Sequence, residues 1–548
     1  MGVSTCRGPT PPRHRPADRG WAVSDAHLLV ILAVASVTLV AVAALRRLGV
    51  PAPVSLVCAG LVIGFLPFVP DVVLQPDVAL YGLLPLLVFD AAVTSSPTGF
   101  VRQARSIGTL AVALVVATGL AVAAVAHWLG QLDWPIAMVL GAAVGPTDAS
   151  AATSVARRLG LPRRLVTIIE GEALFNDATA LVLYAAAVAA ATSGRFSATA
   201  TVARIGWSVL GGVVIGSAVG VVGRWLRNRV DDPPIEIVGS ILLAYAAYLP
   251  AQAAGASGVL AAVTAGLYLG WHASGGALSA RSRLQSQVFW ETLVFLVNAT
   301  LFVLVGLSFH PLSTVTKTPA GRLGATAVAV VVTVVALRLV WMWAFGWLVR
   351  PAGDTPGGRR AGPERLILGW SGMRGAITLA ALLAVPTAGE GGRPLPGRDD
   401  IVFVGFAVIL VTLVGQGLTL PALVRRLRLP ENPSVADAEQ AARVAITQAA
   451  LDHLDQLARQ EHLPGELFDA LRAQYQGRLH RLRSEPDDGE SAEDHEAAVT
   501  AERAVRRAIL DAQRRTLLDL RGRRRLGTTT LRMLERDLDL EEARLRQG

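Results

Sequence analysis

The chain has 548 residues, of which 52% are hydrophobic and only 17% charged, and its formal net charge is +9. Soluble proteins carry about 25% charged residues, so this composition argues against a soluble enzyme. The excess of positive charge lies in residues 1–429, with 32 basic and 19 acidic residues, whereas residues 430–548 hold 19 and 23, which excludes a nucleic-acid-binding protein with a basic soluble face.

Apolar blocks of about bilayer length follow one another along most of the chain. The first block ends in Arg46 and Arg47 rather than at a small-residue cleavage site, so we expect a retained helix and not a signal peptide. The pattern predicts an all-α polytopic membrane protein with about 13 transmembrane helices. The blocks lie near residues 27–45, 54–70, 78–93, 107–128, 134–155, 165–190, 205–223, 234–250, 255–272, 288–308, 323–348, 364–387 and 401–423.

Arginines in the predicted loops set the expected orientation. Every second loop is basic, from Arg46 and Arg47 to Arg425 and Arg426, and the loops between them carry little charge. Because basic loops stay in the cytoplasm, the C-terminus is expected inside and the N-terminus outside. The basic N-terminal tail, residues 1–25, is the exception to this pattern.

The pattern changes after Pro430. Residues 26–428 form the predicted transmembrane domain, and residues 429–548 form a predicted cytosolic helical domain. Helical spacing of leucines and intervening breaks predict four helices in this second domain. They are Val435–Leu457, Leu467–Leu482, Ala501–Leu520 and Thr530–Leu545.

Acidic residues interrupt two of the apolar blocks. Asp148 follows Gly145-Pro146-Thr147 in the fifth block, and Glu172 and Asp177 lie in the sixth. Each charge at mid-membrane costs roughly 2.5–3.5 kcal/mol, so the three together would cost on the order of 8–10 kcal/mol. Such residues face a partner, a water-filled cavity or an ion path, which predicts a transporter.

The two acidic clusters are expected to meet. Pro146 removes a helix hydrogen bond, so the fifth block should be broken beside Asp148. Asp177 lies about twelve residues into the sixth block, roughly at mid-membrane. Both carboxylates can then share one cavity, where a carboxylate can hold either a proton or a cation. Competition for one carboxylate is the simplest chemistry of cation/proton exchange.

Two arginines occur in later blocks. Arg338 and Arg374 would be costly alone, so each should have an acidic or carbonyl partner. Gly372 and Gly375 beside Arg374 predict a second broken helix. Two interrupted segments in corresponding positions are typical of inverted-repeat transporters.

In this order, the motifs resemble the bacterial monovalent cation:proton antiporters of the sodium/proton exchanger superfamily, over roughly residues 26–428. The resemblance implies two discontinuous crossing helices, alternating access and a role in pH and cation homeostasis. The matching segments are Leu84–Asp90, Gly145–Asp148, Glu172–Asp177, Ser257–Ala261, Asn298–Gly306 and Trp370–Gly375.

The resemblance also implies roles for individual residues. Asp177 would carry the ion and the proton, while Asn176, where electrogenic relatives have a second Asp, implies electroneutral one-for-one exchange. Thr147 and Asp148 would line the site. The remaining implied members are an ion pair of Glu172 with Arg338, a helix-break charge at Arg374, Asp90 where many members have Glu, and Ala173 where many have Ser.

These features define the expected function and leave alternatives open. We expect a Na⁺/H⁺ antiporter, not an enzyme, in the bacterial inner membrane, in contact with lipid and forming a homodimer as its relatives do. Li⁺ or K⁺ could replace Na⁺, so a K⁺/H⁺ antiporter of the same fold is an alternative, and a non-transporting cation sensor is a weaker one. An intramembrane aspartyl protease would need Tyr-Asp and Gly-x-Gly-Asp motifs, and a channel would need a filter sequence or charge rings, none of which occurs. With only Cys6 and Cys58, neither a disulfide nor a cysteine metal cluster is expected, and no cofactor is implied.

Overall fold

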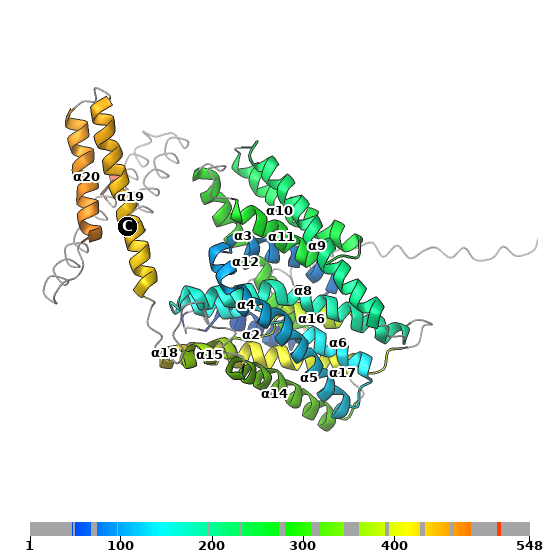
Figure 1. The fold of residues 1–548 in the computed structure, drawn as a ribbon. Coiled ribbons are helices and arrows are strands. Elements are labelled where there is room, and N and C mark those ends of the chain that lie inside the picture. Colours follow the sequence, from blue (N-terminus) through cyan, green and yellow to red (C-terminus); the bar gives the residue numbers. More distant parts are fainter. Residues whose placement is uncertain are drawn as a thin grey trace, which may run out of the picture. The chain divides into compact units, whose positions relative to one another are not determined.

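The structure is a computed structural model that divides into two compact units, Met1–Glu431 and Asn432–Gly548 (Figure 1). The division lies close to the domain boundary expected at residue 428. The residues that the structure describes are 47, 50–66, 69, 74–95, 97–194, 198–230, 232–272, 280–309, 318–344, 361–389, 394–427, 433–460, 465–483, 512–513 and 515–516.

Helices make up nearly all of the described part of the first unit. Proline opens several of them, as at Pro135 in α6 and Pro233 in α10, because its fixed backbone angle suits the first helical turn. In the first half the helices are α2 (Ala52–Gly64), η1 (Val78–Leu83), α3 (Leu84–Thr94), α4 (Pro97–Gly108), η2 (Thr109–Leu114), α5 (Val115–Trp128), α6 (Trp134–Val144), α7 (Ala149–Arg158) and α8 (Arg163–Ser193). In the second half they are α9 (Ala198–Arg227), α10 (Pro233–Ala253), α11 (Gly258–Trp271), α12 (Ala280–Leu307), α14 (Ala320–Ala344), α15 (Ala361–Trp370), α16 (Ala376–Leu383), α17 (Arg398–Leu410), η4 (Val411–Gln416) and α18 (Gly417–Leu427).

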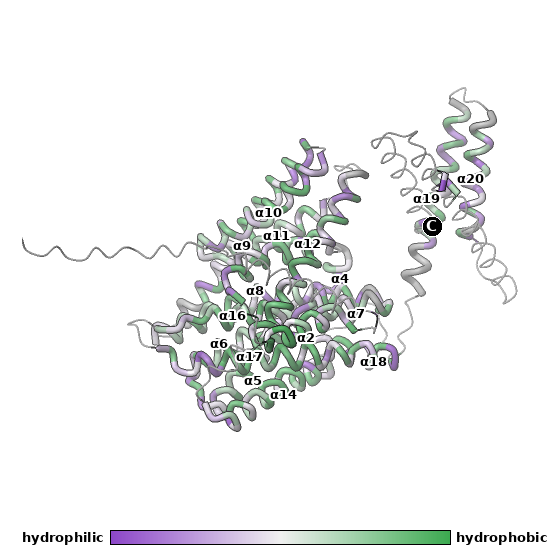
Figure 2. Tube along the Cα trace, turned by 180° about the vertical axis from the view of Figure 1, so that it is seen from behind, coloured by the Kyte–Doolittle hydropathy of each residue, from purple (hydrophilic) through white to green (hydrophobic). Residues whose placement is uncertain are grey.

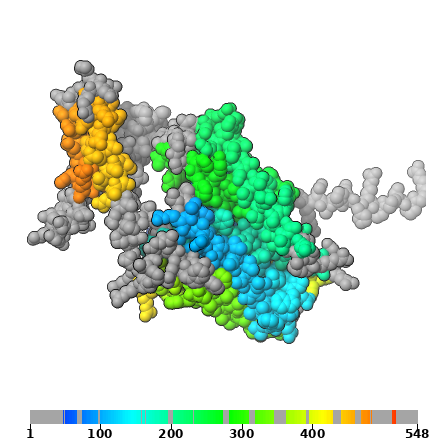
Figure 3. Space-filling model, viewed as in Figure 1, coloured from blue at the N-terminus to red at the C-terminus, as the bar shows by residue number. Residues whose placement is uncertain are grey.

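The helices of the first unit match membrane dimensions. Within the described residues, seven helices are long and apolar enough to cross a bilayer. Figure 2 shows apolar residues through the middle of this unit and polar residues gathered toward many helix ends. Helices α9 and α10 lie at its surface (Figure 3), where they expose Trp207, Trp225 and Leu242. In a bilayer such side chains face lipid without cost.

Two segments of the first unit are broken helices. Helix α6 ends at Val144 and α7 begins after Asp148, while α15 ends at Trp370 and α16 begins after Gly375. The breaks touch, since the Asp148 N–H donates to the carbonyl of Met373 over 2.8 Å. The discontinuities expected at these two places are therefore present, and they meet in the interior.

Small residues allow neighbouring helices to approach closely beside the first break. A Cβ atom on Gly141 of α6 would overlap the backbone of Gly119 on α5. Close backbone contact through glycine is the usual way for membrane helices to pack, because lipid provides no hydrophobic drive between helices. The packing fixes α6, and with it the start of the break at Gly145.

In the second unit the described helices form an antiparallel pair, α19 (Pro433–Gln460) and α20 (Gly465–Arg483). Leu451 and Leu479 are buried, and the Gln440 amide donates to the carbonyl of Leu482 over 3.0 Å. These helices cover the first two that the sequence predicts in this unit. The other two, 501–520 and 530–545, lie almost entirely outside the described residues.

Most of the predicted blocks coincide with described helices. The exception is the first block, 27–45, which lies outside the described residues, so the total of 13 spans stays a prediction. One boundary differs clearly, because the fourth helical segment begins at Pro97 and not near residue 107. Its first turns carry Arg102 and Arg105, which lower the hydropathy of a segment that is nevertheless helical.

Candidate ion-binding site

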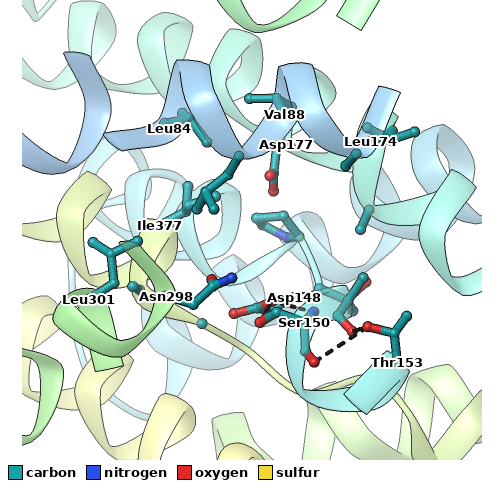
Figure 4. Close-up of a pocket in the computed structure, with 18 of the residues that line it drawn as sticks. Leu84, Val88, Asp148, Ser150, Thr153, Leu174, Asp177, Asn298, Leu301 and Ile377 are labelled. Carbon is teal, nitrogen blue, oxygen red and sulfur yellow. Dashed lines mark hydrogen bonds between the residues drawn. The ribbon is translucent and has the colours of Figure 1, made fainter. Parts of the chain in front are cut away.

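A cavity of 220 Å³ lies beside the two helix breaks (Figure 4). Its walls come from α3, the α6–α7 break, α8, α12 and the start of α16. Leu84, Val88, Leu174 and Ile377 form an apolar part of the wall. The polar residues that line it are Asp90, Thr94, Thr147, Asp148, Ser150, Thr153, Glu170, Asp177, Asn298 and Thr378.

Asp177 is the carboxylate most withdrawn from water in this cavity. It lies near the middle of the 31-residue helix α8 and is 9% exposed. Its side chain points into the cavity (Figure 4). Among the residues that the structure describes, none donates a hydrogen bond to this carboxylate. A buried carboxylate without a donor is stabilised by whatever enters the cavity, either a proton or a cation.

Asp148 is held more firmly than Asp177. It is the N-cap of α7, and its Oδ1 accepts from the backbone N–H of Ser150 at 2.8 Å and from the Ser150 hydroxyl at 2.5 Å. Capping together with the positive end of the α7 dipole stabilises the ionised form of this side chain. The second oxygen, Oδ2, has no such partner within the described residues and lies against Gly375.

Thr147 on the cavity wall and Asn176 behind it form a buried polar contact. The Thr147 hydroxyl donates to Glu172 Oε1 at 2.9 Å and accepts from the Asn176 amide at 2.8 Å. The same amide nitrogen also donates to the Thr147 carbonyl at 3.0 Å. Thr147 lines the cavity, but Asn176 does not. The position of Asn176 is therefore one that supports Thr147 at the break.

Glu172 and Arg338, expected as partners, form a bidentate ion pair between α8 and α14. Arg338 Nη1 lies 2.5 Å from Glu172 Oε1, and Nη2 lies 2.8 Å from Oε2. Both side chains are almost fully buried. Arg338 Nε also donates to the carbonyl of Leu368 over 3.1 Å. The pair thus connects the sixth block, the eleventh block and the start of the second break.

Arg374 is fully buried where the two breaks meet. Its Nη1 donates to the carbonyls of Gly145 and Pro146, and its backbone N–H donates to the Thr412 hydroxyl at 3.2 Å. The sequence predicts that the Arg374 charge compensates helix ends at the break in its own segment, between α15 and α16. The carbonyls that it contacts belong instead to the break after α6, so its charge faces the negative C-terminal end of that helix.

The cavity also contains residues that the sequence did not single out as site members. Asn298, Ser150 and Thr153 all line it, alongside the expected Asp90. Ser150 follows the pattern of an N-cap contact two residues after Asp148, a signal that could have identified it. Asn298 belongs to a quoted motif, but its spacing does not reveal which side of the helix faces a cavity.

Comparison with known proteins places the chain in a family. The family described as sodium/hydrogen exchanger, transmembrane, matches residues 33–426. An uncharacterized Na(+)/H(+) exchanger of Mycobacterium tuberculosis is 36% identical over 525 residues, which are 94% of this chain and 96% of that protein. The Na(+)/H(+) antiporter NhaH of Halobacillus dabanensis is 28% identical over 73% of this chain and 97% of its own length.

A solved structure gives the same indication for the fold. The sodium proton antiporter MjNhaP1 from Methanocaldococcus jannaschii superposes with a TM-score of 0.57, covering 73% of this chain and 99% of that one. At 17% identity this likeness concerns the fold alone. The family assignment rests on the match over residues 33–426 and on the 36% identity to the mycobacterial protein. The chain therefore belongs to the sodium/hydrogen exchanger family of membrane cation/proton antiporters.

Proposed function

We propose that this protein exchanges Na⁺ for H⁺, one for one, with Asp177 as the group that carries each ion in turn. The single observation that best supports the proposal is the contrast among the buried charges. Glu172 and Arg338 bind each other, and Arg374 binds carbonyl groups. Asp177 faces a cavity without a hydrogen-bond donor in the described part of the chain.

The exchange follows from the chemistry of this carboxylate. In a low-dielectric cavity the ionised form of Asp177 needs a compensating positive charge, which either a proton or a monovalent cation supplies. Both cannot occupy it together, so binding of one releases the other. If the cavity opens to one side of the membrane at a time, each cycle carries the cation one way and the proton the other.

The surrounding groups would keep the site in shape while Asp177 changes its occupant. Asp148 stays capped by Ser150, and it contributes negative charge near the cation. Thr147 is oriented by Glu172 and Asn176. Asp90 adds a further carboxylate to the wall of the same cavity. The fixed charges beside the two breaks hold the non-helical backbone together.

Location and assembly belong to the same proposal. The alternating arginine loops support insertion in a bacterial inner membrane with the C-terminus in the cytoplasm and the N-terminus outside. The homodimer and a role in pH and cation homeostasis are carried over from the resemblance. Na⁺ is the proposed substrate because relatives are named Na(+)/H(+) antiporters, and Li⁺ and K⁺ are the competitors to test.

The test is transport by the purified protein in liposomes. An outward Na⁺ gradient should drive proton uptake, read by an internal pH dye, and Asp177→Asn should abolish it because the amide cannot ionise. Asp77→Asn is the matched control, since Asp77 is exposed and does not line the cavity. Cation-dependent proton flux that persists in Asp177→Asn would refute the assignment. Running the same assay with Li⁺ and K⁺ identifies the preferred cation.

A further inference from the structure

Asn298 is a polar side chain on the part of the cavity wall that α12 forms, which is otherwise apolar. It lies in α12, and the other residues that α12 contributes to the cavity are Val294, Leu301 and Phe302. Figure 4 shows its amide pointing from α12 toward Asp148, across the cavity from α8. Among the described residues, no hydrogen bond to this amide is recorded.

An amide in this position calls for an explanation. Its side chain is half-buried in the cavity wall, where an amide without a protein partner can bind whatever enters the cavity. On the same helix the Thr300 hydroxyl is used locally, donating to the carbonyl of Leu296 over 2.9 Å. The amide of Asn176 is likewise used to support Thr147. Asn298 makes no such structural contact within the described part of the chain, so its polar atoms remain available to a ligand in the cavity.

Two other neutral oxygens near the carboxylates already make hydrogen bonds within the protein. The Thr147 hydroxyl both donates to Glu172 and accepts from Asn176, and the Ser150 hydroxyl is bound to Asp148. Position 173 on the cavity wall is an alanine and offers no oxygen. A small monovalent cation needs several oxygen ligands to replace its water, and the Asn298 amide places one such oxygen on the wall opposite Asp177.

We propose that Oδ1 of Asn298 is a ligand of the transported cation, contributed by α12 from the side of the cavity opposite Asp177. The inference rests on the proposed cation exchange and adds a residue that governs cation affinity. An amide oxygen is a neutral ligand, so it strengthens cation binding without adding a charge that a second proton would have to neutralise. Proton binding at Asp177 does not use this oxygen, so Asn298 affects the cation more than the proton.

The amide nitrogen provides the competing explanation. Nδ2 could donate to the Asp148 carboxylate and merely orient it. The two roles are separable by substitution, because Asn298→Asp keeps an oxygen at the same position and removes the N–H donors, whereas Asn298→Ala removes both. Thr300→Ala is the matched control, since Thr300 lies on the same helix, is exposed and does not line the cavity, and the substitution also removes a polar group.

The experiment measures Na⁺-driven proton flux in liposomes as a function of Na⁺ concentration, together with the shift in melting temperature that Na⁺ causes in detergent. Asn298→Ala should raise the KM for Na⁺ by about tenfold, the usual effect of losing one good polar contact, and leave the maximal rate within about twofold. The Na⁺-induced stabilisation should weaken in parallel. Asn298→Asp should keep the KM near or below that of the wild type, and Thr300→Ala should leave it unchanged.

Two results would overturn the inference. A KM for Asn298→Ala equal to that of Thr300→Ala would show that the amide does not bind the cation. A rise in KM for Asn298→Asp as large as for Asn298→Ala would assign the effect to the N–H donors. Melting temperatures without Na⁺ show whether each variant is folded. Failure of the proposed function would give a different result. Asp177→Asn would then retain exchange, while the KM values of the Asn298 variants could still be compared.

Discussion

At the scale of single residues, the site contains buried charges that are paired within the protein and one carboxylate, Asp177, that we propose carries the transported ions. The Glu172–Arg338 pair is bidentate and almost fully buried, and Arg374 is bound to the carbonyls of the first break. Glu172 and Arg338 compensate each other's charge inside the protein, and Arg374 faces carbonyl oxygens. Asp177, by contrast, faces the cavity and accepts no hydrogen bond from the described residues.

Removing one partner of the buried pair should therefore be more harmful than removing both. Glu172→Gln or Arg338→Gln alone leaves an unpaired buried charge, at a cost of about 3–5 kcal/mol. The double variant leaves none and should melt at a higher temperature than either single variant. Thermal unfolding of the four proteins in detergent gives the comparison. Losses that simply add would show that the two side chains do not interact.

A second ion pair in the same unit provides the control for this cycle. Arg164 Nη1 lies 3.3 Å from Glu364 Oε2, and both side chains are more than one-fifth exposed. A pair that water reaches is worth only about 0–1 kcal/mol. Arg164→Gln and Glu364→Gln should consequently change the melting temperature little, which separates burial from ion pairing as the source of the effect.

At the scale of elements, the site depends on two helix breaks that touch. Asp148 donates its backbone N–H to Met373, and Gly375 lies directly against the Asp148 carboxylate. The backbone of Gly375 is extended, with φ −126° and ψ −164°, a conformation that other residues adopt freely. The need for glycine therefore arises from the close approach of Asp148 and not from backbone strain.

Gly375→Ala should consequently impair transport. The new Cβ would overlap the Asp148 carboxylate, so either that side chain or the start of α16 must move. Overpacking of this kind costs about 1–3 kcal/mol and should be accompanied by a loss of exchange in liposomes. Gly321→Ala in α14 is the control, because a Cβ there meets open space. Unimpaired exchange by Gly375→Ala would show that the contact between the breaks is dispensable.

The breaks were predictable from sequence, and other features were not. Gly145-Pro146 and Gly372 with Gly375 indicate interrupted helices through backbone chemistry alone, and the structure confirms the interruptions. The π-helical segments η1, η2 and η4 could not be predicted, because their wider turn with i→i+5 hydrogen bonds is not marked by any change in hydropathy. The partners of Arg374 and the orientation of Asn298 depend on which helices become neighbours, and spacing within one helix carries no such information.

At the scale of the whole molecule, the question is how much charge crosses the membrane in one cycle. The proposed carrier is a single carboxylate, Asp177. The residue before it, where electrogenic relatives have a second Asp, is Asn176, which is fully buried and bound to Thr147. Asp148 is the remaining acid that could change its protonation. Its N-cap position and two contacts with Ser150 favour the ionised form in this structure, and the proposal accordingly assigns proton binding and release to Asp177.

Transport should therefore be independent of membrane potential. If Asp177 must lose one proton before it binds one Na⁺, the charges moved in the two directions cancel. The test uses liposomes clamped by a potassium diffusion potential, with Na⁺ as the substrate and a protonophore, an ionophore that carries H⁺ alone, in parallel vesicles as the positive control. The rate of proton flux should stay constant as the potential is varied, while the ionophore responds. Two results would contradict this prediction: a flux that accelerates with the potential, or a current on a solid-supported membrane that outlasts the binding transient. Either would mean that Asp148 or another acid also exchanges a proton. The one-for-one stoichiometry would then be wrong.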